Sequence, residues 1–226
     1  MKHGFHPLKS IYAELPGDHW TIYLTGPFPT SNNMNHYILV MVDIATQFIL
    51  LWPIPDKQAA MIAAYLFQAF CEFGFPKVLQ SDNGTEFVNK IIKMVVETAS
   101  IDHRLITPYH PRANGVAEKH VHTVVQALQK WLKGTKKDWD LYIPETQFAI
   151  NTKVAAIHGS TLFSLMFRRQ YNSFQDYKDI EPKSLSHPQL QKYMDYLTAV
   201  VFPSISEQIQ GKQQKIMDKF NWKTHA

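Results

Sequence analysis

Hydrophobic residues gather in three short runs near the start of the chain, and each run is rich in β-branched and aromatic side chains. The runs occupy residues 19–24, 36–43 and 47–52, and polar turn residues separate the first run from the second. Apolar runs of this length that end in turn residues are typical of buried strands. The pattern therefore predicts three neighbouring strands of one sheet.

Helical and strand patterns alternate after these runs. Residues 56–73 read as a helix that Asp56 caps and that ends at Gly74, with apolar positions on one stripe at Ala60, Ala63, Leu66, Phe67 and Phe70. A strand at 77–81, a helix at 86–99 and a strand at 102–106 follow. A helix from about Gly115 to Trp131 and another over 138–154 complete the pattern. This order predicts an α/β fold with a mixed sheet and helices on both faces.

The composition changes after Tyr171, where the chain becomes polar and rich in glutamine. Apolar residues keep a helical spacing there, at Leu190, Tyr193, Met194, Leu197, Val200 and Val201. We therefore divide the chain into a lead-in at 1–15, a compact domain at 16–171 and a helical extension at 172–226.

The net charge and the cysteine content exclude few classes of protein. The 226 residues carry a net charge of +4, which is compatible with an anionic partner without requiring one. A single cysteine, Cys71, on a helix face that we expect to be buried, excludes an internal disulfide framework. No apolar run approaches the roughly 18 residues that span a bilayer, so we expect a nuclear or cytoplasmic protein without a membrane partner.

Two acidic residues occupy positions that suit chemistry, although each also has an ordinary structural explanation. Asp82 ends a predicted strand and precedes the turn dipeptide Asn83-Gly84, while Glu118 lies in the first turns of a helix. Glu118 shares a helix side with Val121, Val125 and Leu128, so we expect its carboxylate to face inward. An inward carboxylate needs a partner, and a divalent cation is a natural one.

A pair of acids suggests phosphodiester chemistry, in which attacking and leaving oxygens both carry negative charge. Two Mg²⁺ ions about 3.5–4 Å apart can stabilise both oxygens, and hard oxygen ligands hold such ions. Three carboxylates are an economical set of ligands, and the bridging one belongs on a central strand.

The ordered combination of motifs resembles the catalytic core of integrases from gypsy-class LTR retrotransposons and retroviruses. The matching residues are Trp20, Leu24-Thr25-Gly26-Pro27, Tyr37-Ile38-Leu39-Val40, Val42-Asp43, Phe73-Gly74, Pro76, Ser81-Asp82-Asn83-Gly84, Glu86-Phe87, Tyr109-His110-Pro111, Asn114-Gly115, Glu118, Phe148-Ala149, Asn151 and His158. The resemblance implies a ribonuclease H-like fold with a five-stranded sheet. It also implies Mg²⁺- or Mn²⁺-dependent 3′-end processing and DNA strand transfer, with Asp82 and Glu118 as catalytic acids and metal ligands.

The chain departs from this family at Tyr23, where the family has its first catalytic aspartate. A phenol is uncharged at neutral pH and is a poor ligand for Mg²⁺. We therefore expect weak or absent metal binding and impaired catalysis, unless Asp43 or Asp18 replaces the missing acid. Whether the chain is an enzyme depends on this position. The family's zinc-binding module and its C-terminal barrel or chromodomain are not expected within these 226 residues.

The resemblance also implies partners. Arg112, Asn114 and Lys119 lie nearest Glu118 in the sequence, and they are our candidates for contacts with phosphates of DNA or RNA. A homodimer through the core is expected, and no small-molecule substrate. A non-catalytic module that binds proteins is the alternative function.

Four histidines allow a zinc interpretation that we weigh against an ordinary one. They are His103, His110, His120 and His122. Because no pair of cysteines accompanies them and His120 and His122 point to different helix faces, we expect loop and surface histidines instead.

Overall fold

The computed structural model describes residues 15–106, 111–132, 137–155 and 159–172, together with single positions between 188 and 207. For residues 111–118 and Trp131 it describes the backbone alone. The chain forms two compact units, Met1–Lys153 and Val154–Ala226. The domain boundary that the sequence suggests after residue 171 stays a prediction.

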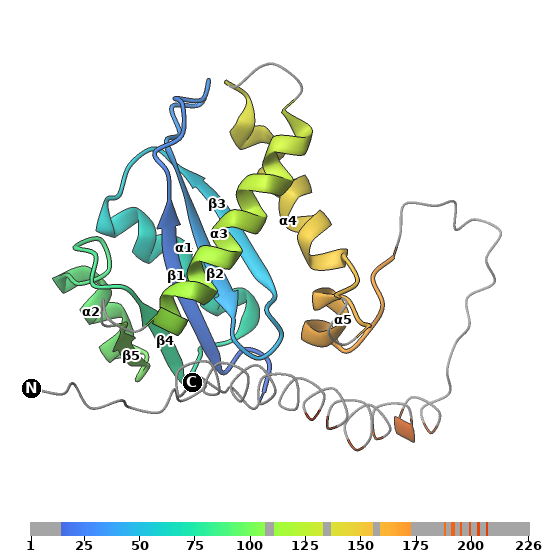
Figure 1. The fold of residues 1–226 in the computed structure, drawn as a ribbon. Helices are drawn as coiled ribbons and strands as arrows, with labels where there is room; N and C mark the ends of the chain where they lie inside the picture. Colours follow the sequence, from blue (N-terminus) through green and yellow to red (C-terminus); the bar gives the residue numbers. More distant parts are fainter. Residues whose placement is uncertain are drawn as a thin grey trace, which may run out of the picture. The chain divides into compact units, whose positions relative to one another are not determined.

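A five-stranded mixed sheet forms the centre of the first unit (Figure 1). Its strands are β1 (His19–Thr25), β2 (Tyr37–Asp43), β3 (Ile49–Ile54), β4 (Val78–Ser81) and β5 (Asp102–Leu105), in the order β3-β2-β1-β4-β5. β1 is the central strand, antiparallel to β2 and parallel to β4. The mixed sheet and the central place of the first strand are therefore as the sequence predicted.

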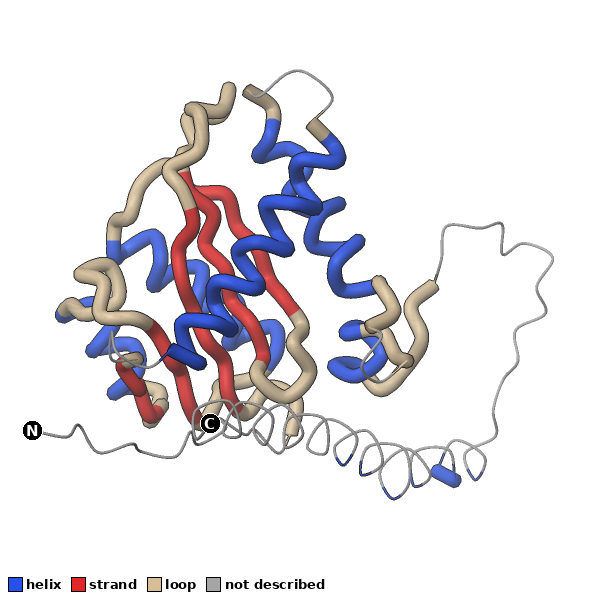
Figure 2. Tube along the Cα trace, viewed as in Figure 1, coloured by secondary structure: helices blue, strands red, loops and turns tan. Residues whose placement is uncertain are grey.

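Helices cover both faces of this sheet (Figure 2). They are α1 (Ala59–Phe73), α2 (Lys90–Thr98), α3 (Pro111–Trp131), the short 3-10 helix η1 (Trp139–Tyr142) and α4 (Ile143–Thr152). On the α1 side, the Trp20 ring lies edge-on to Phe73, with 5.8 Å between ring centroids. α3 crosses the opposite face and buries His120, Val124 and Leu128 at intervals of four residues. Among the described residues, no helix has the length and apolar character of a membrane span.

The start of α1 and the orientation of its faces differ from the prediction. The helix begins at Ala59 after Gln58, and Asp56 does not cap it but accepts a hydrogen bond from the Gln58 backbone N–H. The buried side consists of Ile62, Ala63, Leu66, Ala69 and Phe70. Ala60, Phe67 and Cys71 are exposed, because α1 packs on one flat sheet face and leaves its outer side free. The expectation of a buried cysteine was therefore wrong.

The ends of two helices show how local chemistry sets their boundaries. α1 ends at Gly74, whose positive φ of 93° suits glycine and whose N–H donates to the Phe70 carbonyl, as predicted. α2 begins at Lys90 rather than near residue 86. The Asn89 side chain caps it by accepting hydrogen bonds from the backbone N–H groups of the following turn.

Side chains of α4 cover the open edge of the sheet along β3. Asn151 Oδ1 accepts from the Ile49 N–H at 2.9 Å, and Asn151 Nδ2 donates to the Ile49 carbonyl at 2.8 Å. Gln147 Oε1 accepts from the Leu51 N–H at 2.7 Å. Helix amides therefore satisfy backbone groups that a neighbouring strand would otherwise pair.

A buried carboxylate fixes the connection between β1 and β2 against η1. Asp140 Oδ2 accepts hydrogen bonds from Ser31 Oγ, Asn33 Nδ2 and Asn35 Nδ2 at 2.7, 3.0 and 2.8 Å. Burial alone would raise the pKa of Asp140, but these hydrogen bonds outweigh it and hold the pKa below its ordinary value. The carboxylate therefore stays ionised and holds this connection in place at neutral pH.

The second unit is described over a short stretch only. It contains α5 (Leu162–Phe167), capped by Thr161, whose Oγ1 accepts from the Ser164 N–H at 3.0 Å. A single bridge pairs Val154 with Thr161. Most of the helical extension predicted for residues 172–226 lies outside the described residues.

Candidate functional site

Two adjacent parallel strands bring the first two positions of the expected acidic set together. In the register of β1 and β4, Trp20 pairs with Leu79 and Ile22 pairs with Ser81. The next residues along the two strands are Tyr23 and Asp82. The parallel register therefore puts Tyr23, two residues before the end of β1, next to Asp82, the first residue after β4.

Tyr23 is buried, and its hydroxyl group has no hydrogen-bond partner among the described residues. Because side chains alternate along a strand, Tyr23 points away from the face where Trp20 meets α1 and towards the face that α3 crosses. The residue is 5% exposed, and its hydroxyl makes no hydrogen bond within the part of the chain that the structure describes. Burial raises the pKa of the phenol well above its ordinary value, so Tyr23 is neutral at physiological pH.

Asp82, in contrast, is exposed in the turn that follows β4. Its Oδ1 accepts a hydrogen bond from the Gly84 backbone N–H at 2.8 Å. This contact is the common bond of an aspartate that begins a turn, and it leaves the second carboxylate oxygen for other partners. The structure thus places one acid at the site and keeps it accessible.

The third expected acid, Glu118, lies in α3. Its side chain, and those of Arg112 and Asn114, lie outside the described residues, so the inward direction expected for Glu118 stays a prediction. Lys119 is exposed, as a phosphate-binding residue must be.

Neither alternative acid joins this site. Asp43 pairs with Trp20 across β1 and β2 and so lies on the α1 face of the sheet, opposite to Tyr23. Its carboxylate accepts hydrogen bonds from the Gly17 and Thr46 N–H groups and from Thr46 Oγ1, while burial raises its pKa. Asp18 precedes β1, at the far end of the strand, and forms an ion pair with Lys77 at 2.7 Å.

The described histidines form no metal site. His103 Nε2 lies 2.9 Å from Ser81 Oγ, and His120 Nε2 lies 2.8 Å from Gln47 Oε1. His120 is buried, so the expectation of a surface histidine was wrong there. Burial lowers its pKa to about 4, with a smaller contribution from Lys119. His122 is exposed, and His110 lies outside the described residues.

The described side chains do not fit a two-metal centre. Such a centre needs several hard anionic ligands, and no group of three His, Cys, Asp or Glu residues gathers anywhere in the described part of the chain. At the carboxyl ends of β1 and β4 a neutral phenol occupies the central position beside Asp82. β1 contains no acidic residue, so a dication beside Asp82 would receive no carboxylate from this strand.

Two charged residues to which the sequence analysis gave no role lie at the same end of the sheet. Lys57, between β3 and α1, places its Nζ 3.5 Å from Glu86 Oε1, in the turn that follows Asp82. The two residues are far apart in the sequence and meet because β3 and β4 end at the same edge of the sheet, so no local motif could have revealed the pair.

Comparison with known proteins agrees with this geometry. Residues 13–111 match the family model of the integrase core domain, a range that includes Tyr23 and Asp82. The chain is 29% identical over 161 residues to the retrovirus-related Pol polyprotein from transposon 412 of Drosophila melanogaster, covering 70% of this chain and 13% of that protein. It is 29% identical over 193 residues to the Pol polyprotein of Radiation murine leukemia virus (strain Kaplan), covering 84% and 33%. The chain thus spans a third or less of these relatives' length.

Solved structures show the same fold at low sequence identity. The HTLV-2 integrase catalytic core domain in complex with magnesium, in a trimeric form, has a TM-score of 0.56 at 18% identity over 67% of this chain and 97% of that one. Its dimeric form has a TM-score of 0.55 at 18% identity over the same shares. The simian T-cell lymphotropic virus intasome in complex with PP2A regulatory subunit B56 gamma has a TM-score of 0.63 at 17% identity, over 82% and 66%.

Removing the Tyr23 hydroxyl tests whether this buried group has a hydrogen-bond partner. We expect Tyr23→Phe to leave the free energy of unfolding unchanged or to raise it by about 1 kcal/mol, because the buried hydroxyl loses water without gaining a partner. Urea denaturation measures this change, with Tyr65→Phe as the matched control. A loss above about 1 kcal/mol would show that the hydroxyl has a structural partner after all.

Proposed function

We propose that this chain, which resembles the integrase cores of retroviruses and retrotransposons, binds nucleic acid at the Tyr23–Asp82 site but has largely lost integrase chemistry. The observation that supports this proposal most directly is Tyr23 itself, which is buried and neutral and has no hydrogen-bond partner in the described part of the chain. The resemblance to integrase cores implies 3′-end processing and strand transfer on DNA at a site of three acids. Tyr23 occupies the position where the resemblance implies the first of these acids.

The expected loss of catalytic rate follows from the negative charge that Tyr23 does not supply. At an effective dielectric of about 20, a unit charge about 4 Å from a dication contributes on the order of 8 kcal/mol before desolvation. Losing half of that in the transition state slows a reaction about a thousandfold. Asp43 and Asp18 do not offset this loss, since their carboxylates are engaged elsewhere.

A neutral residue 23 also changes what the site can bind without metal. Three carboxylates would repel a phosphodiester unless cations neutralised them. With Tyr23 uncharged, the site carries one negative charge fewer, so a DNA or RNA backbone meets less repulsion. Arg112, Asn114 and the exposed Lys119 are our candidates for contacts to that backbone.

We further propose a homodimer through the core, because two helices of the first unit expose apolar side chains. Phe67 on α1 is 54% exposed and Phe148 on α4 is 53% exposed. Phe148 lies in an open groove of about 650 Å³ whose other lining residues are Pro144, Glu145, Ala149, Thr152 and Lys153. Exposed apolar surface of this kind favours association between subunits.

Restoring the missing acid tests the proposed cause of the loss. We expect the protein to show no Mg²⁺ binding by calorimetry and no nicking of DNA ends in Mg²⁺ or Mn²⁺, because the bridging anion is absent. Tyr23→Asp should bind Mg²⁺ and raise nicking at least about a hundredfold, and Tyr23→Asp with Asp82→Asn should lose both gains.

Two outcomes would contradict this account. Failure of a folded Tyr23→Asp variant to bind Mg²⁺ would mean that more than one ligand is missing. Metal-dependent nicking by the unaltered protein, abolished by Asp82→Asn, would mean that catalysis survives.

Nucleic-acid binding should be independent of metal. We expect affinity for duplex DNA, measured by fluorescence anisotropy, to fall with salt because counterions are released, and to be the same with and without EDTA. A full-length protein that shows no salt-dependent affinity for DNA or RNA would favour the alternative, a non-catalytic module that binds proteins.

Charged substitutions at the exposed phenylalanines test the proposed homodimer. We expect Phe148→Lys and Phe67→Lys to shift the protein from dimer to monomer in light scattering, because each buries a charge in an apolar interface. Met94→Lys, at a residue of α2 that is 62% exposed, is the matched control and should stay dimeric. A monomeric starting protein, or equal dissociation by Met94→Lys, would exclude this interface.

A further inference from the structure

The carboxylates of Asp82 and Glu86 both lie close to Gly84 in the turn that follows β4. A Cβ on Gly84 would lie 2.7 Å from the Glu86 carboxylate and 2.9 Å from Asp82 Oδ1. The Asp82 and Glu86 carboxylates therefore lie close to each other, with only the bare Gly84 Cα between them. This turn concentrates negative charge at the carboxyl end of β4.

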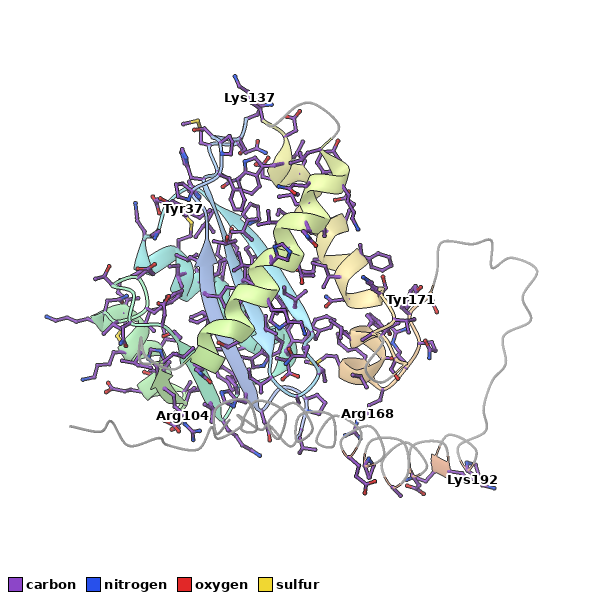
Figure 3. All side chains as sticks on the ribbon, viewed as in Figure 1. Tyr37, Arg104, Lys137, Arg168, Tyr171 and Lys192 are labelled. Carbon is purple, nitrogen blue, oxygen red and sulfur yellow. The ribbon has the colours of Figure 1, made fainter. Side chains whose placement is uncertain are left out.

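Lys57 supplies a positive charge directly beside this turn. Its Nζ lies 3.5 Å from Glu86 Oε1 and 5.2 Å from the centre of the Tyr37 ring. Tyr37, labelled in Figure 3, begins β2, and its Cδ1 would lie 2.9 Å from a Cβ on Gly26, the residue that follows β1. Lys57 therefore lies at one end of the sheet, between the residue that follows β1 and the turn after β4 that contains Glu86.

The Lys57 ammonium is exposed enough to bind a second partner. Its side chain is 47% exposed, while that of Glu86 is only 13% exposed. The separation of 3.5 Å is longer than a charge-assisted hydrogen bond. Because an ammonium has three N–H donors, a phosphate oxygen can bind the exposed side of Lys57 without leaving the largely buried Glu86 carboxylate unpaired.

We propose that Lys57 is a phosphate-binding residue of this site, which contacts the backbone of a bound DNA strand, and that Glu86 holds the ammonium ready when DNA is absent. This inference rests on the proposed nucleic-acid binding and names one of its contacts. Tyr37 orients the lysine through its ring face, a contact that favours a cation over a neutral side chain.

Charge removal at Lys57 tests the inference against a matched lysine. Lys93 also forms a single ion pair, with Glu97 at 3.6 Å, but it lies on the outer side of α2. We expect Lys57→Met to weaken DNA binding about threefold to tenfold and to reduce the slope of log affinity against log salt by about one. Lys93→Met should leave both quantities near those of the unaltered protein.

Substitution of Glu86, the ion-pair partner of Lys57, provides a second test of the inference. Glu86→Gln should strengthen DNA binding, because it frees the ammonium and removes a negative charge beside it. This gain should largely disappear in the Lys57→Met background, since the two residues act as one pair.

The outcomes separate this inference from the proposed function. If the unaltered protein binds DNA and Lys57→Met behaves like Lys93→Met, the inference fails while the proposed function stands. Weaker binding by a folded Glu86→Gln variant would also overturn it. If the unaltered protein binds no DNA at any salt concentration, the proposed function and the inference both fail. Circular dichroism of each variant confirms that it is folded before binding is measured.

Discussion

The parallel pairing of β1 with β4 is the constraint on which the whole account of this protein depends. That pairing puts residue 23 next to Asp82 at the centre of the sheet. Residue 23 is also buried, at 5% exposure, so the phenol is shielded from water. A neutral side chain at this position is therefore set by the central strand of the sheet and not by a surface loop.

Much of the fold could be predicted because strand and helix periods are local properties of the sequence. The apolar runs around β1, β2 and β3 identify strands, and Gly74 marks a helix end because it tolerates a positive φ. The start of α1 was missed since Asp56 binds Gln58 instead of capping the helix. Cys71 was misjudged because sequence periodicity shows that a helix has two sides but not how much of each side a partner covers.

The site was predictable only in part, for a related reason. Asp82 stands out because a turn dipeptide follows a strand, and Tyr23 stands out because a known motif leads to that position. Nothing local distinguishes Asp43 from a catalytic acid, and only the register with Trp20 shows that it lies on the other face of the sheet. Lys57 and Glu86 meet because β3 and β4 run in the same direction and end at the same edge of the sheet, which sequence periodicity alone does not specify.

The amide side chains of Asn151 and Gln147 have a consequence for how copies of this protein can associate. By occupying the backbone groups of Ile49 and Leu51, they close the β3 margin to strand addition. Two molecules therefore cannot merge their sheets into one continuous ribbon along β3. Self-association on this side therefore has to proceed through helix surfaces and not through strand pairing.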